Sequence, residues 1–117
     1  YEASGFVVRH LIELGGAPAR RIVATGGGTR VGPWMQAIAD ATGLPVAVSA
    51  VPEGAALGAA FLARIAVGLE SSIADAARWA SVEHTIEPNP GWTDPMEERY
   101  KRFLELSDGG RRQPRGL

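Results

Sequence analysis

The residues best suited to binding a ligand are three consecutive glycines, Gly26, Gly27 and Gly28, followed by Thr29. They come directly after a short β-branched apolar run and before a helical pattern. Backbone N–H groups in such a strand-to-helix loop, together with the helix dipole, favour a phosphate or a nucleotide, and glycine lets the ligand approach closely. The same glycines also fit a plain tight turn. Their position alone leaves both interpretations open.

The residues around the glycines exclude two familiar phosphate-binding motifs. A P-loop needs Lys and then Ser or Thr after its second glycine, whereas Gly32 is followed by Pro33. A Rossmann fingerprint needs Gly or Ala where this chain has Val31, and an acidic residue at the end of the next strand, which ends at Ser49. A dinucleotide-binding protein is therefore disfavoured.

The elements that must position the glycines have an α/β pattern. Apolar spacing predicts a helix over residues 2–14, strands at residues 21–25 and 45–49, and a helix between the strands that stops at Gly43. This is the size of one right-handed βαβ unit, in which the strands are parallel. Two strands are too few for a parallel sheet covered on both faces. We therefore expect further strands from upstream sequence or from a second copy.

The second half of the chain is predicted to be largely helical. Residues 53–63 are mostly small and apolar, which predicts a buried helix. Ser72 and Asp75 resemble a capping box and predict a short helix that ends near Trp79. Three further segments are an extended piece at residues 83–87, a helix that starts at Thr93, and a loose tail at residues 107–117.

Composition and charge exclude several classes of partner. The 12 Lys and Arg against 13 Asp and Glu give a net charge of -1, so we expect neither nucleic acid nor an anionic membrane as a partner. No apolar run reaches the roughly 18 to 20 residues of a membrane span. The chain has no Cys, and His10 and His84 stand far apart in the sequence, so no metal site is predicted.

Three motifs in a fixed order carry a family resemblance. They are Val23-Ala24-Thr25-Gly26-Gly27-Gly28-Thr29, then Trp34-x-Gln36-x-x-Ala39-Asp40-x-x-Gly43-x-Pro45-Val46, and then Glu53-Gly54-Ala55-Ala56-Leu57-Gly58-Ala59-Ala60. The first resembles the adenosine motif of actin-like ATPases, which have a ribonuclease-H-like fold. Together they resemble the C-terminal domain of the FGGY carbohydrate kinases, and within it the xylulokinase-like members. The resemblance covers residues 1–106 and implies a partial actin-like domain, the C-terminal portion of the second kinase domain.

The resemblance implies that these residues supply the adenosine-binding side of an ATP-dependent sugar kinase. Six positions match the nucleotide-binding region: Gly26, Gly27, Gly28, Thr29, Val31 and Gln36. Val31 stands where relatives often carry Ser or Asn near the base, so a side-chain hydrogen bond there is lost. Gln36 is expected to cap or brace the loop more than to touch the nucleotide. Trp34 is expected in the core, and Glu53 is expected to cap its helix rather than to catalyse.

The resemblance also implies what lies outside these residues. The general-base aspartate, the upstream phosphate loops and the Mg ligands belong to the missing N-terminal part, so this chain contributes no catalytic residue and is expected to be inactive alone. The implied cofactor is ATP or ADP with Mg, the substrate is a sugar, and the location is cytoplasmic. The alternative is a non-catalytic nucleotide-binding or assembly module with an actin-like half-domain. If the chain folds alone, its uncovered sheet edge predicts a homodimer.

Overall fold

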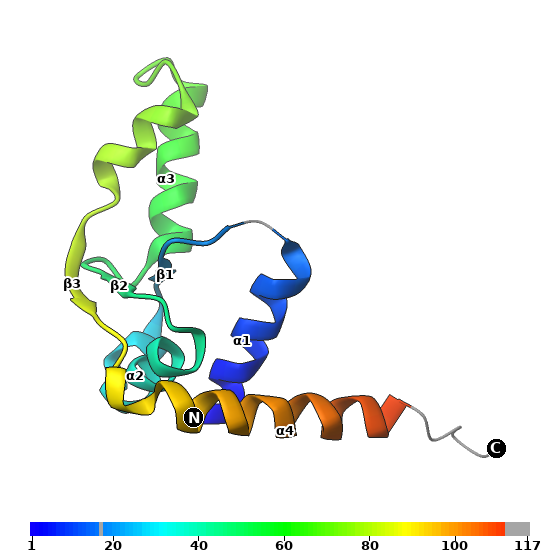
Figure 1. Cartoon of the computed structure of the whole chain (residues 1–117). Coiled ribbons are helices and arrows are strands. Elements are labelled where there is room, and N and C mark those ends of the chain that lie inside the picture. Colours follow the sequence, from blue (N-terminus) through cyan, green and yellow to red (C-terminus); the bar gives the residue numbers. More distant parts are fainter. Residues whose placement is uncertain (17, 112–117) are drawn as a thin grey trace.

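The computed structural model describes residues 1–16 and 18–111 (Figure 1). The helices are α1 (Glu2–Gly15), α2 (Gly32–Thr42), α3 (Gly54–Ala66) and α4 (Thr93–Arg111). The strands are β1 (Ile22–Ala24), β2 (Val46–Ser49) and β3 (Val82–Ile86). Three short 3-10 helices are η1 (Gly27–Arg30), η2 (Ile73–Trp79) and η3 (Pro90–Trp92). Among the described residues, no helix combines the length and the apolar character needed to cross a membrane.

The three strands form one sheet in the order β1-β2-β3. β1 and β2 are parallel, as the predicted βαβ unit requires, with Val23 opposite Ala47. β3 contains most of the predicted extended segment and pairs antiparallel with β2, with a register irregularity between Val48 and Ser49. The α/β class and the parallel strand pair are therefore confirmed, and β3 adds a third strand.

α2 covers one face of this sheet. Its side chains Met35, Ile38 and Ala39 are buried in one cluster with Val46 of β2. α1 lies across α2 at very close range at Gly5, where an added Cβ would come within 2.8 Å of both the Ala37 carbonyl oxygen and Ala41 Cβ. A glycine at this position lets the two helix backbones meet.

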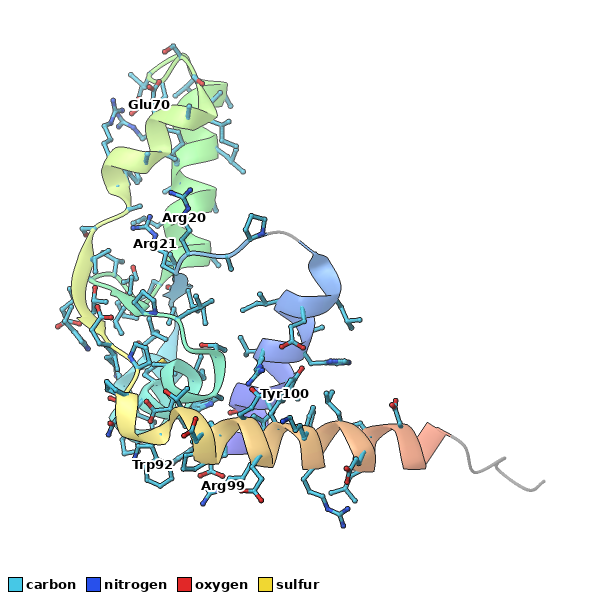
Figure 2. The ribbon with its side chains drawn as sticks, viewed as in Figure 1. Arg20, Arg21, Glu70, Trp92, Arg99 and Tyr100 are labelled. Carbon is cyan, nitrogen blue, oxygen red and sulfur yellow. The ribbon has the colours of Figure 1, made fainter. Side chains whose placement is uncertain are left out.

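α4 is held to α1 by a cluster of aromatic side chains. Phe6 of α1 packs against Tyr100 and Phe103 of α4, with ring centroids 5.7 Å apart in both pairs. The Tyr100 hydroxyl donates a 2.6 Å hydrogen bond to the Glu13 carboxylate, and Arg9 pairs with Glu97 at 2.7 Å. Burial and the Glu13 hydrogen bond raise the pKa of Tyr100 to about 12. The first and last helices are thus joined by apolar and polar contacts, and Figure 2 shows Tyr100 on the α1 side of α4.

The prediction of a buried helix at residues 53–63 is wrong for this chain. α3 buries only Phe61, which packs edge-on against Trp79 of η2 at 5.2 Å between centroids. Leu62, by contrast, is 55% exposed. The reason is that α3 and η2 together extend away from the sheet (Figure 1), and no other described element covers the outer faces of α3.

The predicted loose tail is also corrected in part, because α4 continues as a helix through Arg111. Once a helix is nucleated, each further residue adds a hydrogen bond at small entropic cost. Here the residues Tyr100 and Phe103 hold the middle of the helix by packing, and the next proline in the sequence, which would break the helix, is Pro114. The rest of the predicted tail, residues 112–117, lies outside the described residues.

Glu70 lies at the end of α3 and η2 that is far from the sheet (Figure 2), where it pairs with two arginines. Glu70 is buried and accepts hydrogen bonds from Arg64 and Arg78. The Ser72–Asp75 capping box starts η2 as predicted, although the helix is of the 3-10 type. The hydrogen bonds from Arg78 and Arg64 hold the pKa of Glu70 below its ordinary value of 4.5.

This lowered pKa predicts a pH dependence. Because the folded state favours the ionised Glu70 carboxylate, its contribution to stability is present above about pH 4.5 and is lost as the pH falls through the lower, folded pKa. Glu70→Gln and Arg78→Gln should each reduce the loss of stability between pH 6 and pH 3, measured by urea unfolding. If the free energy of unfolding of both variants falls with pH as steeply as that of the unsubstituted chain, Glu70 is not the source of this pH dependence.

Candidate functional site

The glycine loop leaves the carboxyl end of β1 and forms the first turn of η1. Gly26 has a φ of 96°, a conformation that residues with a Cβ rarely adopt. The Thr29 hydroxyl donates a 2.7 Å hydrogen bond back to the Gly26 carbonyl, and the Thr29 amide donates to the same oxygen at 3.2 Å. The loop is therefore a closed turn of defined shape.

Gly27 presents bare backbone to the outside. It is exposed, and an added Cβ would meet no atom within 4 Å. Within the described part of the chain, the N–H groups of Gly27 and Gly28 have no backbone partner. Free amides next to the carboxyl end of a parallel strand can donate hydrogen bonds to an anionic or nucleotide ligand.

Gly28 instead faces inward and lies against Trp34 of α2. An added Cβ would come within 2.8 Å of Cζ3 of this indole. Trp34 is half-buried and packs against the core beneath α2, in agreement with its predicted core role. The tight turn thus depends on Gly26, whereas the exposed backbone is that of Gly27.

The start of α3 and the residues before it contact Thr25, the residue that follows β1. The Thr25 hydroxyl donates to the Pro52 carbonyl at 3.2 Å, and an added Cβ on Gly54 would meet this hydroxyl at 2.9 Å. Glu53 occupies the N-cap position as expected, but its side chain makes no capping hydrogen bond. Between α3, η2 and the ends of β1 and β2 lies an apolar groove of about 250 Å³.

Gln36 does not brace the glycine loop, which corrects the expectation from sequence. Its amide nitrogen donates to Asp40 Oδ1 at 2.9 Å and to the Glu87 carbonyl at 3.0 Å. Asp40 Oδ1 also accepts from the backbone N–H of Asn89 at 2.7 Å. Gln36 and Asp40 therefore fix the segment that leaves β3, because both lie on the face of α2 that meets this segment.

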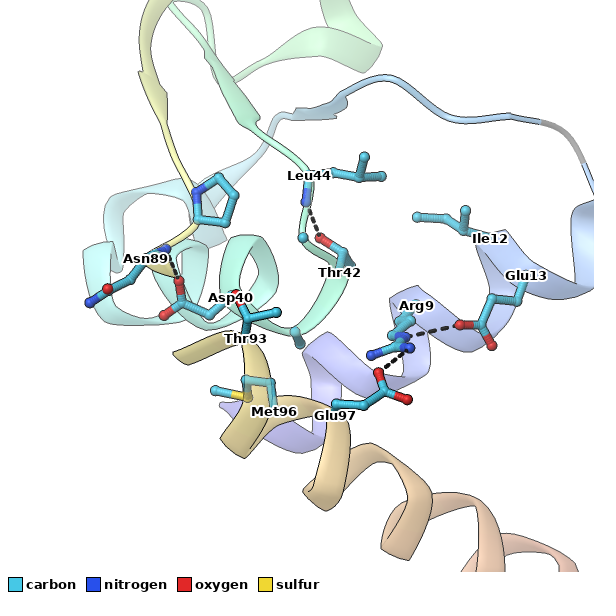
Figure 3. A pocket seen from close by; sticks show the side chains of 13 residues that line it. Arg9, Ile12, Glu13, Asp40, Thr42, Leu44, Asn89, Thr93, Met96 and Glu97 are labelled. Carbon is cyan, nitrogen blue, oxygen red and sulfur yellow. Dashed lines mark hydrogen bonds and ion pairs between the residues drawn. The ribbon is translucent and has the colours of Figure 1, made fainter. Parts of the chain in front are cut away.

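A second cavity, of about 310 Å³, lies between α1, the end of α2 and the start of α4 (Figure 3). Arg9, Glu13 and Glu97 line it, and Arg9 is paired with both of these carboxylates. None of the loop glycines lines this cavity. His10 lies 3.4 Å from the Tyr100 hydroxyl and His84 lies 3.7 Å from Glu83, so neither histidine belongs to the glycine loop.

Sequence reasoning missed the residues beneath the loop. Trp34 Nε1 donates a 2.6 Å hydrogen bond to the Ser4 hydroxyl in the first turn of α1. The Tyr1 ring stacks on the same indole at 6.1 Å between centroids. The helical spacing of residues 2–14 predicts α1 but carries no sign that its first turn reaches α2 near the loop.

The model of the FGGY family of carbohydrate kinases, C-terminal domain, matches residues 1–67, which include the glycine loop and α2. The chain belongs to this family. A glycerol kinase from Bordetella parapertussis is 40% identical over 106 residues, covering 86% of this chain and 20% of that protein. An autoinducer-2 kinase from Yersinia enterocolitica is 37% identical over 83 residues, covering 68% of this chain and 15% of that protein.

Solved structures agree with this FGGY assignment. The xylulose kinase from Rhodospirillum rubrum superposes with a TM-score of 0.74 at 32% identity, covering 92% of this chain and 23% of that chain. A kinase described as a xyloylose kinase from Brucella ovis gives a TM-score of 0.63 at 27% identity, with the same two coverages of 92% and 23%. The partial actin-like fold expected from the sequence is therefore confirmed. The chain spans about a fifth of the length of the FGGY kinases that it matches.

Proposed function

We propose that the chain is the adenosine-binding part of an ATP-dependent carbohydrate kinase, which transfers the γ-phosphoryl group of ATP to a hydroxyl of a small sugar or polyol. The observation that carries this proposal is the exposed Gly27 backbone at the carboxyl end of β1, within the region that matches the FGGY family. Phosphoryl transfer depends mainly on positioning and on charge stabilisation. A loop that is closed by hydrogen bonds and has free amides would position the nucleotide.

The candidate residues in and after the loop divide into groups with different proposed roles. Gly27 and Gly28 offer their amides to the nucleotide, while Gly26 and Thr29 close the turn that aims these amides. Val31 offers an apolar side chain near the base. The Gln36 amide nitrogen is already engaged at Asp40 and Glu87, so we assign Gln36 to support of the fold rather than to nucleotide contact.

We assign the Mg ligands and the general base to the remainder of the kinase. The described residues bring together no group of three His, Asp or Glu side chains that could hold a metal ion. The free amides of the loop fit a nucleotide, which supplies the phosphoryl group when bound. The residues of this chain then orient the nucleotide and exclude water from one side of it.

The remainder of the kinase is also the proposed partner of the open sheet edge. β1 pairs only with β2 among the described strands, and Val23 on it is 58% exposed. A free apolar strand recruits pairing. In the whole protein, a strand from the remainder of the kinase would cover this edge. For the chain alone, the alternative is a homodimer. We place the whole protein in the cytoplasm, where ATP is available.

For the substrate we propose a xylulose-like sugar. The support is the superposition on the xylulose kinase from Rhodospirillum rubrum, whereas the curated relatives named above are a glycerol kinase and an autoinducer-2 kinase. ATP-dependent phosphorylation of xylulose and of glycerol by the complete kinase distinguishes these substrates. Turnover of glycerol alone would overturn the xylulose proposal and leave the kinase proposal intact.

Titration of the chain with ADP tests the nucleotide site. We expect weak binding, with chemical-shift changes centred on the amides of Gly27 and Gly28 in nuclear magnetic resonance spectra. Gly27→Val should abolish binding without unfolding the chain, because its side chain would enter open space on the ligand side. Thermal unfolding measured in parallel checks that the variant is folded.

The matched control is Gly15→Val, which adds the same side chain at the far end of α1, also in open space. This variant should bind ADP like the unsubstituted chain. Equal ADP binding by the folded Gly27→Val variant would overturn the assignment of the loop. Tighter binding of NAD than of ADP would favour the dinucleotide-binding class instead.

A further inference from the structure

The glycine loop is supported by an indole ring that belongs to the following helix. The position for a Cβ on Gly28 lies 2.8 Å from Cζ3 of Trp34 and 3.4 Å from Cε3, so the loop backbone rests against the six-membered ring. The indole is fixed in turn, because Nε1 donates a 2.6 Å hydrogen bond to Ser4 Oγ. The loop is therefore connected through one side chain to the first turn of α1.

Two further contacts complete this support. The Ser4 hydroxyl donates its own hydrogen to the Tyr1 carbonyl at 2.6 Å, which orients its lone pairs to accept from the indole. The Tyr1 ring is stacked on the Trp34 ring with an angle of 17° between planes. The indole is thus held at its N–H by Ser4 and over its ring by Tyr1, while Gly28 lies against it.

The loop has few other ties to the rest of the chain. Its described backbone hydrogen bonds are local: the Thr29 amide donates to the Gly26 carbonyl, and the Val31 amide donates to the Gly28 carbonyl. These bonds close the turn but do not tie it to α1, so both the place of the turn and how often its two bonds open depend on what supports it. The packing of Gly28 on Trp34 supplies that placement.

We propose that Trp34, anchored by Ser4, is a positioning residue that sets where the Gly26–Gly28 loop presents its amides to the nucleotide. This inference rests on the proposed function. Hydrogen bonds weaken steeply when the donor moves out of line, so a loop that shifts on its support loses affinity even when its own residues are unchanged. Ser4 and Trp34 then act on nucleotide binding without touching the nucleotide.

The first test needs no nucleotide. Ser4→Ala removes the anchor and leaves the ring, and Trp34→Leu removes the ring. Hydrogen exchange of the Thr29 and Val31 amides should become about twofold to tenfold faster in Ser4→Ala, and faster still in Trp34→Leu. Ser107→Ala is the matched control, because it removes a serine hydroxyl that donates to Phe103 on α4. Exchange at Thr29 and Val31 that is unchanged in the folded Ser4→Ala variant would overturn the inference.

The second test measures ADP affinity together with the free energy of unfolding. The ADP dissociation constant should rise about twofold to tenfold in Ser4→Ala while the chain stays folded. Gly28→Ala should weaken binding by pushing the loop off the ring, and adding Trp34→Leu should recover part of that loss by making room for the methyl group. Additive losses in the double variant would contradict positioning by Trp34.

The two proposals fail in different ways. If the unsubstituted chain does not bind ADP, the proposed nucleotide site is wrong, whereas the exchange of Thr29 and Val31 still decides whether Trp34 places the loop. If the unsubstituted chain binds ADP and the folded Ser4→Ala and Trp34→Leu variants bind it equally well, the nucleotide site stands and the role of Trp34 is refuted.

Discussion

Replacement of Phe6 by alanine is expected to lower the free energy of unfolding by about 3–5 kcal/mol. Phe6 is 5% exposed and forms the centre of the cluster that joins α1 to α4. Its loss leaves a cavity beside the stacked rings of Tyr100 and Phe103, and neither ring can fill the cavity without breaking that stack. Urea unfolding followed by circular dichroism measures the change.

The control for Phe6→Ala is Val7→Ala on the same helix. Val7 is 47% exposed, so its truncation should change the free energy of unfolding by about 0.5 kcal/mol or less. A loss below about 1 kcal/mol for Phe6→Ala would mean that α4 is not held to α1 by this cluster. Faster proteolysis of α4 in Phe6→Ala than in Val7→Ala would give independent support for the contact.

Gly5→Val is expected to cost about 3 kcal/mol, near the upper end of the range for overpacked sites. The position for a Cβ lies 2.8 Å from the Ala37 carbonyl oxygen, which is part of the α2 backbone and cannot turn aside like a flexible side chain. The two helices must therefore separate. Because α2 carries Trp34 and follows the glycine loop, this variant should disturb the loop as well as the core.

Gly15→Val on the same helix separates this steric effect from the intrinsic helix propensity of valine. Gly15 has no atom within 4 Å of its Cβ position, so this variant should be nearly neutral in an unfolding experiment. Equal stability of the Gly5 and Gly15 variants would show that α1 and α2 do not meet at Gly5. The free energy of unfolding of Gly5→Ala should lie between those of Gly5→Val and Gly15→Val.

The βαβ unit was predictable because each of its signals is local. The β-branched residues near Val23 end at glycine, and Pro33 and Gly43 mark the two ends of the helical pattern. The structure places α2 between residues 32 and 42 and makes the two flanking strands parallel. Local sequence rules suffice where each signal concerns residues within one or two turns of one another.

The parts that could not be predicted depend on contacts over long distances in the chain. The apolar residues of α3 indicate burial, but the sequence does not say that the described chain lacks an element to cover Leu62. Gln36 lies one turn into α2, where its side chain could reach either the glycine loop or the segment that follows β3. Only the fold shows that the Glu87 carbonyl accepts its hydrogen bond. The link from Ser4 to Trp34 spans two helices and leaves no periodic signal.

The two edges of the sheet have opposite chemical character. β3 places Glu83 and His84 on its exposed strand, and ionisable side chains on an edge oppose the addition of another strand. The residues of β1, Ile22, Val23 and Ala24, carry no charge. Growth of the sheet is therefore expected beyond β1 and not beyond β3.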